Sequence, residues 1–155
     1  MAQTETCMDN MACVGGFCER LMALDATVRF VGIADYGGKL LISKYRKGLV
    51  PIMDKNETEQ YALQTVFRAR SRGGFTPQLG NQLYAVSVYE KLVRVTITVN
   101  NDLEKEFHNV YILLSIDVGM EHQKVIENKV LPFVIQERQK LFGMTRIFSE
   151  KYAEA

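Results

Sequence analysis

Five segments of the chain have the apolar patterns of β-strands: two alternate apolar and polar residues, and the others are rich in β-branched, aromatic or continuous apolar residues. In residues 92–99 the apolar side chains of Val93, Val95, Ile97 and Val99 point one way, and the polar residues between them point the other. Asp35-Tyr-Gly-Gly38 supplies the positive-φ positions of a hairpin turn between the first two segments. We therefore predict strands at residues 27–34, 39–46, 83–89, 92–99 and 110–116.

Three other segments repeat apolar residues at helical spacing, at residues 9–24, 57–72 and 121–140. The second is predicted to begin after an N-cap at Asn56, to end at Gly73-Gly74 and to be kept on the sheet by one apolar face. Pro132 is expected to kink or split the third helix. The predicted apolar face of the second helix consists of Ala62, Leu63, Val66, Phe67 and Ala69.

The order of these elements is α-β-β-α-β-β-β-α. Hairpin-linked strands with helices between and outside them predict an α+β fold, a five-stranded antiparallel sheet covered by helices. We expect an N-terminal helical segment at residues 1–26, a single α+β domain at 27–140 and a C-terminal tail at 141–155. At 155 residues the chain has the length of about one domain.

Composition and charge add only modest constraints. Hydrophobic residues make up 47% and charged residues 24%, which excludes wholesale disorder, and no apolar run has the ~20 residues of a membrane helix. Net charge is −3 over residues 1–26, +6 over 27–99 and −2 over 100–155. The odd count of three cysteines, without a signal-peptide pattern, predicts free thiols and a cytoplasmic location.

No catalytic signature is present in the sequence. The segment Gly32 to Lys39 partly resembles a P-loop motif, but it lacks the first glycine of that motif and the hydroxyl residue after the lysine. A hairpin turn explains the glycines that are present. There is no nucleophile elbow, no carboxylate pair and no cysteine spacing typical of zinc. We expect no enzyme activity, no cofactor and no metal.

Basic residues gather in two places, which leaves an RNA-binding alternative open. One cluster is Lys44, Arg46 and Lys47, and the other contains Arg68 and Arg72. Nearby aromatic residues could stack on bases, whereas the overall pI near 7.7 is low for such a protein. A second alternative is a PAS-like sensor that holds a small ligand between sheet and helix.

Arg70 stands apart from the other arginines of the second helix. At 100° per residue it falls on the apolar face between Leu63 and Val66, where a guanidinium needs a carboxylate or carbonyl partner. We therefore predict a structural role for Arg70, largely buried and paired, and partner binding by Arg68 and Arg72.

The chain resembles the roadblock/dynein-light-chain domains in element order, close relatives in shape of profilin, and it is similar to a family of small uncharacterised archaeal proteins. The matching residues are Val28-Arg-Phe-Val-Gly-Ile33, Tyr45-Arg46, Gly48-Leu49, Pro51, Arg68, Arg72, Leu79-Gly80, Tyr84-Ala85, Tyr89-Glu-Lys91 and Arg94-Val-Thr-Ile97. The resemblance implies a dimer that serves as a platform for a partner such as a small GTPase. It implies no catalytic residues.

In the roadblock-like strand order, residues 83–89 form an edge of the sheet. Edge strands of monomers usually carry Lys, Pro or a bulge, and this segment has none. We therefore predict a homodimer that continues the sheet or pairs the second helices, unless the 75–82 loop or the C-terminal tail covers the edge. The interaction residues predicted on this strand are Leu83, Tyr84, Val86, Val88 and Tyr89. The function predicted from the sequence is a non-enzymatic interaction or scaffold module.

Overall fold

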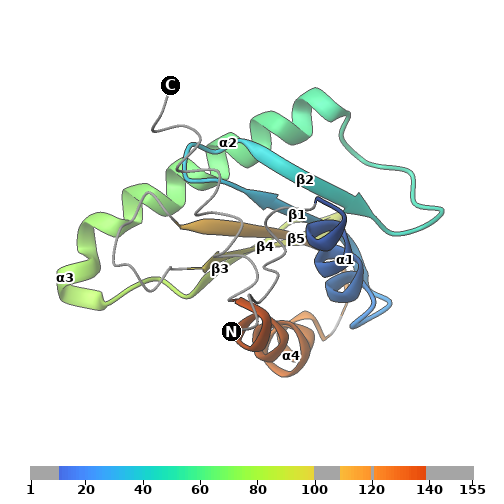
Figure 1. Cartoon of the computed structure of the whole chain (residues 1–155). Helices are drawn as coiled ribbons and strands as arrows, with labels where there is room; N and C mark the ends of the chain where they lie inside the picture. The colour runs from blue at the N-terminus through green and yellow to red at the C-terminus, as the bar shows by residue number, and fades with distance from the viewer. Residues whose placement is uncertain (1–10, 100–108, 120, 139–155) are drawn as a thin grey trace, which may run out of the picture.

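The computed structural model describes residues 11–99, 109–119 and 121–138. A five-stranded antiparallel sheet with strand order β2-β1-β5-β4-β3 forms its centre, and helices cover both faces (Figure 1). The α+β fold and the element order are those predicted, with one extra short helix. The strands are β1 (Val28–Ala34), β2 (Leu40–Tyr45), β3 (Tyr84–Val88), β4 (Leu92–Val99) and β5 (Val110–Asp117).

Strand β5 is the middle of the sheet and separates the two hairpins. It pairs with β1 on one side and with β4 on the other, both antiparallel. Its residues Val110 to Ile116 are all buried, because side chains on both of its faces are covered by helices. Strands β2 and β3 are thereby left as the two edges.

One face of the sheet is covered by α1 (Met11–Met22) and by the C-terminal helix that starts as α4 (His122–Val125) (Figure 1). Val14, Phe17, Cys18 and Leu21 of α1 recur at i, i+3, i+4 and i+7 and are fully buried. The ring of Phe17 packs against that of Phe133, with the ring centroids 5.3 Å apart. These contacts join the first and last helices over the sheet.

The other face is covered by α2 (Lys55–Arg72), whose start and buried side differ from the prediction. The N-cap is Asp54 rather than Asn56, in a capping box in which Asp54 accepts from the Glu57 N–H and Glu57 accepts from the Asp54 N–H. Leu63 and Phe67 are 39% and 49% exposed. The buried residues of the helix are Thr58, Ala62, Thr65 and Val66.

The turn between β1 and β2 requires a glycine at position 38. Gly38 has φ of +85°, and a Cβ atom there would lie 2.7 Å from Cδ1 of Leu63 on α2. The side chain of Asp35 accepts a hydrogen bond from the Lys39 N–H at 2.9 Å. The predicted hairpin turn is confirmed, and it lies against α2.

Pro132 disturbs the C-terminal helix, as predicted, but it does not split it. The chain passes from α4 through a π-helical turn, η4 (Ile126–Val130), and continues as helix over residues 131–138. Proline has no N–H to donate to the preceding turn, and a widened turn just before it accommodates the ring. The predicted turn at residues 100–102 and the tail at 141–155 lie outside the described residues.

The cysteines depart from the expectation of three free thiols, because Cys13 is disulfide-bonded. Cys18 is free, and burial raises the pKa of its thiol to about 12, so it is unreactive at neutral pH. The argument from cysteines to a reducing compartment therefore does not hold. Among the described helices, none is long and apolar enough to cross a membrane.

Asp25 connects the segment before β1 to the C-terminal helix. Its carboxylate accepts hydrogen bonds from the Thr27 N–H at 3.0 Å, the Thr27 hydroxyl at 2.7 Å and the Lys129 ammonium at 2.7 Å. These bonds lower the pKa of Asp25 from 3.8 to about 2, the one to Lys129 contributing most. A carboxylate with a lowered pKa stabilises the fold above its unfolded pKa and loses that effect as the pH falls.

We expect Asp25→Asn to lower the free energy of unfolding by about 1 kcal/mol at pH 7, as for a partly solvated charged pair. The difference from the unsubstituted protein should shrink as the pH falls below about 4 and through about 2, because the folded carboxyl then also takes up its proton. Urea denaturation at a series of pH values measures it. Glu121→Gln, which removes an exposed pair with Lys124, is the control. A difference independent of pH would contradict the prediction.

Candidate interaction surface

The outer edge of β3 presents unpaired backbone groups. The Tyr89 N–H donates to the Leu92 carbonyl at 2.9 Å, and the Thr98 N–H to the Leu83 carbonyl at 3.3 Å, so odd-numbered residues of β3 bond to β4. The backbone N–H and C=O groups of Tyr84, Val86 and Val88 therefore point away from the sheet. In the described part of the chain, no strand pairs with this edge.

The side chains along the same edge are exposed and largely apolar. Leu83 is 70% exposed, Val88 64%, Tyr89 45% and Val86 38%, while Tyr84 packs partly onto the core. The preceding segment, η2 (Gly73–Phe75) and α3 (Thr76–Leu79), does not pair with β3. The expectation of an edge strand is confirmed, and residues 75–82 do not pair along it. Cover by the C-terminal tail lies outside the described residues.

Helix α2 meets this end of the sheet through Tyr61, a residue that the sequence pattern did not single out. The guanidinium of Arg94 on β4 lies over the Tyr61 ring, 4.1 Å from its centroid. Burial and a hydrogen bond with Tyr89 raise the pKa of Tyr61. The helix, β4 and the end of β3 are therefore joined by Tyr61, Arg94 and Tyr89. Strand alternation placed Arg94 on the polar side, without revealing that a helix covers that side.

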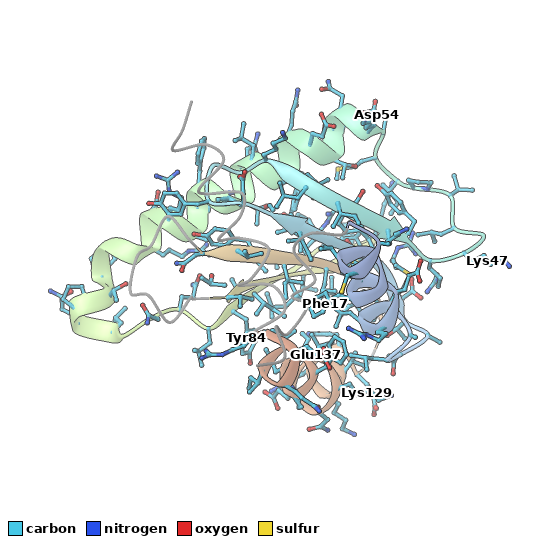
Figure 2. The ribbon with its side chains drawn as sticks, viewed as in Figure 1. Phe17, Lys47, Asp54, Tyr84, Lys129 and Glu137 are labelled. Carbon is cyan, nitrogen blue, oxygen red and sulfur yellow. The ribbon has the colours of Figure 1, made fainter. Side chains whose placement is uncertain are left out.

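The two basic clusters lie at opposite ends of the β2–α2 unit. Lys47 lies in the loop that leads from the end of β2 to the start of α2, at its far tip and apart from Asp54 (Figure 2). Arg72 is the last residue of α2, about 27 Å further along for a helix of 18 residues. The structure does not bring residues 44–47 and 68–72 together, so they form no single nucleic-acid surface.

Within the first cluster, charge is already partly compensated. Arg46 Nη1 bonds to the Ala26 carbonyl at 2.7 Å and to the Asp117 carboxylate at 2.8 Å. Lys44 lies 3.7 Å from Glu19 of α1. In the second cluster Arg68 donates to Gln64 at 3.3 Å, and Arg72 is exposed. Arg46 thus fixes the end of β2 to β5, whereas Lys47, Arg68 and Arg72 face solvent.

The prediction that Arg70 is largely buried is wrong. Arg70 is exposed, and its guanidinium stacks over the Tyr36 ring at 3.8 Å and donates to the Tyr36 carbonyl at 3.3 Å. The aliphatic part of the side chain extends past the helix flank to reach the β1–β2 turn. The carbonyl partner was anticipated, but the burial was not, since the side of α2 that faces the sheet is centred nearer Ala62 and Thr65.

The described residues contain no group of three or more His, Cys, Asp or Glu residues that could hold a metal ion. Along β3, the described residues combine an open strand edge with exposed apolar side chains.

Comparison with known proteins supports the fold. No family model matches the chain, and no curated protein matches it in sequence. Among solved structures, the gliding protein MglB of Thermus thermophilus superposes with a TM-score of 0.59 at 14% identity, over 88% of each chain. A roadblock/LC7 domain of Streptomyces avermitilis has a TM-score of 0.60 at 8% identity, over 81% of this chain and 95% of that one. MglB of Myxococcus xanthus has 0.55 at 18% identity, over 91% and 98%. The chain therefore has the roadblock/LC7 fold.

Because Arg70 is exposed, we expect Arg70→Ala to lower the free energy of unfolding by about 1 kcal/mol or less, the range of exposed cation–π contacts. A buried pair would cost about 3–5 kcal/mol. Urea denaturation at neutral pH distinguishes the two. Arg68→Ala is the matched control, since the Arg68 guanidinium donates to Gln64 on its own helix. A decrease of about 3 kcal/mol or more in the free energy of unfolding for Arg70→Ala would contradict this prediction and indicate a buried pair.

Proposed function

We propose that this protein is a non-enzymatic interaction module that self-associates through the edge of β3. The observation that carries the proposal is the outward-facing backbone of Tyr84, Val86 and Val88, with apolar side chains exposed along it. A strand of a second copy would satisfy these N–H and C=O groups, and a two-fold axis through the edge would bury the same side chains of both copies.

The two edges of the sheet differ in a way that favours β3. Strand β2 carries Lys44, and its pairing with β1 shifts register between Ile33 and Ala34, both of which discourage pairing with another chain. Strand β3 has no charged residue, no proline and no register shift. Among the structures with this fold, one of MglB is described as having a tetrameric arrangement, at a TM-score of 0.57 and 15% identity. This supports self-association as a property that the fold allows.

The dimer would act as a platform for a regulatory protein partner. Roadblock-like domains are platforms for partners such as small GTPases, and the shared fold supports extending that role to this chain. Helix α2 presents further exposed side chains, with Arg68 and Arg72 among its exposed cations and Leu63 and Phe67 on the flank toward the β1–β2 turn.

Proline at position 86 tests the edge directly. The Val86 N–H points outward, so Val86→Pro removes no bond to β4, and proline is tolerated on an edge strand in this orientation. We expect the unsubstituted protein to have twice the 17.7 kDa chain mass in light scattering and Val86→Pro to be a folded monomer. Circular dichroism should show the same secondary structure for both.

Ser87→Pro is the matched control, since the Ser87 N–H bonds to β4. It should lower the free energy of unfolding by at least about 1 kcal/mol, the loss of a ladder hydrogen bond. Phe67→Lys tests the alternative in which the α2 helices pair. If Phe67→Lys separates the copies and Val86→Pro does not, or if the unsubstituted protein is monomeric at high concentration, the proposed interface is wrong.

A further inference from the structure

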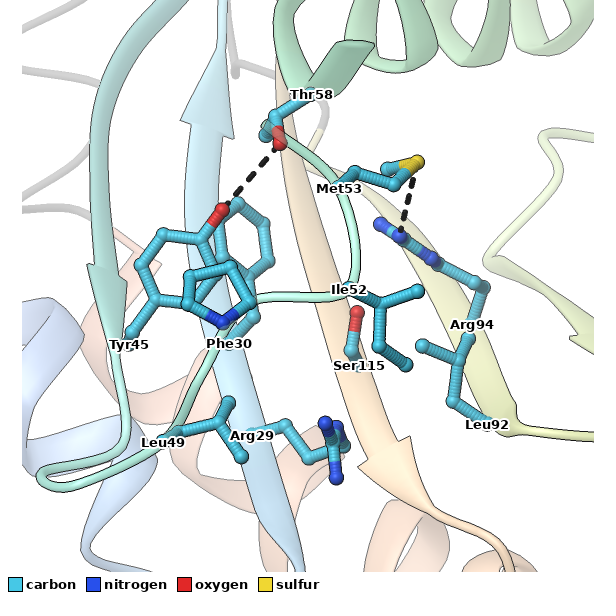
Figure 3. Close-up of a pocket in the computed structure, with 11 residues that line it drawn as sticks. Arg29, Phe30, Tyr45, Leu49, Ile52, Met53, Thr58, Leu92, Arg94 and Ser115 are labelled. Carbon is cyan, nitrogen blue, oxygen red and sulfur yellow. Dashed lines mark hydrogen bonds between the residues drawn. The ribbon is translucent and has the colours of Figure 1, made fainter. Parts of the chain in front are cut away.

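A hollow lies on the α2 side of the sheet, below the segment that leads from β2 into α2. Figure 3 shows residues of this segment, Leu49, Ile52 and Met53, above strands β1, β5 and β4. The hollow has a volume of about 20 Å³, room for about one water-sized polar group. The hollow is separate from the outer edge of β3, and it does not depend on the proposed dimer.

The register of the sheet explains why space remains there. One row of paired residues crosses all five strands on this side, and it has a serine on each side of Arg94. The row runs Ser87, Arg94, Ser115, Phe30 and Tyr45 from β3 to β2. The short side chain of Ser115 fills little of the space beside Arg94 in this row, and the guanidinium of Arg94 extends toward Met53 (Figure 3).

Positive charge at this end of the sheet exceeds negative charge. Arg29 and Arg46 share one carboxylate, that of Asp117, at 2.7 and 2.8 Å. Arg94 forms no ion pair with any carboxylate in the described ranges. Its guanidinium contacts the Tyr61 ring at 4.1 Å and Met53 Sδ at 3.9 Å (Figure 3). Three arginines thus stand against one acid, and burial lowers the pKa of Arg94, as expected for a charge without a counter-ion.

The surroundings of the hollow are apolar and partly exposed. Ile52 is 51% exposed and Val50 83%, on the same segment that forms the upper wall, and Tyr45 at the far end of the row is 37% exposed. A charged anchor point within an apolar rim is the arrangement typical of an interface hot spot. Guanidinium groups bind carboxylates with two parallel hydrogen bonds.

We propose that this hollow docks an acidic peptide segment of a protein partner, with one carboxylate side chain on Arg94 and flanking apolar side chains against Val50 and Ile52. The excess of positive charge favours an anionic ligand. The small volume of the hollow admits only the carboxylate group, and the exposed apolar side chains at its rim contact the neighbouring residues of the peptide. Arg94 is the specificity-determining residue, and Ser115 is a second donor at the floor.

The test uses two blocked tripeptides that differ by one charge, acetyl-Leu-Glu-Leu-amide and acetyl-Leu-Gln-Leu-amide, titrated into the full chain and followed by two-dimensional NMR. The glutamate peptide should shift the amide signals of Met53, Arg94 and Ser115 in a saturable manner, and the glutamine peptide should bind at least tenfold more weakly. Raising the NaCl concentration from about 50 to about 300 mM should weaken binding of the glutamate peptide, because salt screens the attraction between its carboxylate and Arg94.

Arg94→Gln should reduce affinity for the glutamate peptide at least tenfold, while Arg72→Gln, at the far end of α2, should change it less than twofold. If Arg94→Gln does not fold, Ile52→Ser on the exposed rim should still reduce affinity at least threefold. Equal binding of the two peptides, unchanged binding by the folded Arg94→Gln variant or by Ile52→Ser, or acetate binding as tightly as the tripeptide would each overturn the proposal.

Discussion

The insertion of β5 between two hairpins is the constraint on which the rest of the structure depends. Each hairpin keeps its own antiparallel pairing, β1 with β2 and β3 with β4, and β5 pairs with the inner strand of each. Because β5 comes last of the five, both hairpins must leave one side of an inner strand open for it. The outer strands β2 and β3 then become edges, whatever their own sequences.

The central position of β5 also explains why the two faces of the sheet are covered by side chains of different size. A strand buried on both sides needs apolar residues at nearly every position, which β5 has from Val110 to Leu114, followed by Ser115 and Ile116. Helices α1 and α4 fill one side with large apolar side chains, whereas α2 contributes Thr58, Ala62, Thr65 and Val66. Smaller side chains on the α2 side allow polar groups such as Arg94 and Ser115 to lie beneath the helix.

The strands were predictable because their pattern is local. Alternation in residues 92–99 fixed both the element and its two faces, and the structure places Val93, Val95 and Ile97 in the core. The start of α2 was predicted less well, since Asn56 and Asp54 are both good caps and only the reciprocal bonds between Asp54 and Glu57 distinguish them. The apolar face of α2 was misplaced because Leu63 and Phe67 lie on a flank that the sheet does not reach.

The chemistry of individual arginines could not be read from spacing, because it depends on elements distant in sequence. Arg70 donates a hydrogen bond to Tyr36, which is 34 residues away in the sequence, and Arg46 donates one to Asp117, which is 71 residues away. The strand pattern places Arg94 on the polar side of β4, and it is α2, joined to the sheet by tertiary packing, that covers that side. A helical wheel or strand pattern gives the direction of a side chain relative to its own element, but not what occupies that direction.

The charge of this protein is therefore better described by which cations have acidic partners in the structure than by where cations cluster in the sequence. Of the five cations in the two sequence-defined clusters, Lys44 and Arg46 have acidic partners, and Lys47, Arg68 and Arg72 are exposed to water. None of these cations is both shielded from water and without an acidic partner among the described residues. Arg94 is half-buried, stacked on an aromatic ring and without a carboxylate among the described residues, and electrostatic interactions strengthen as water is removed. Arg94, a residue outside every basic cluster, is thus the cation that we propose for recognition of an anion on this face.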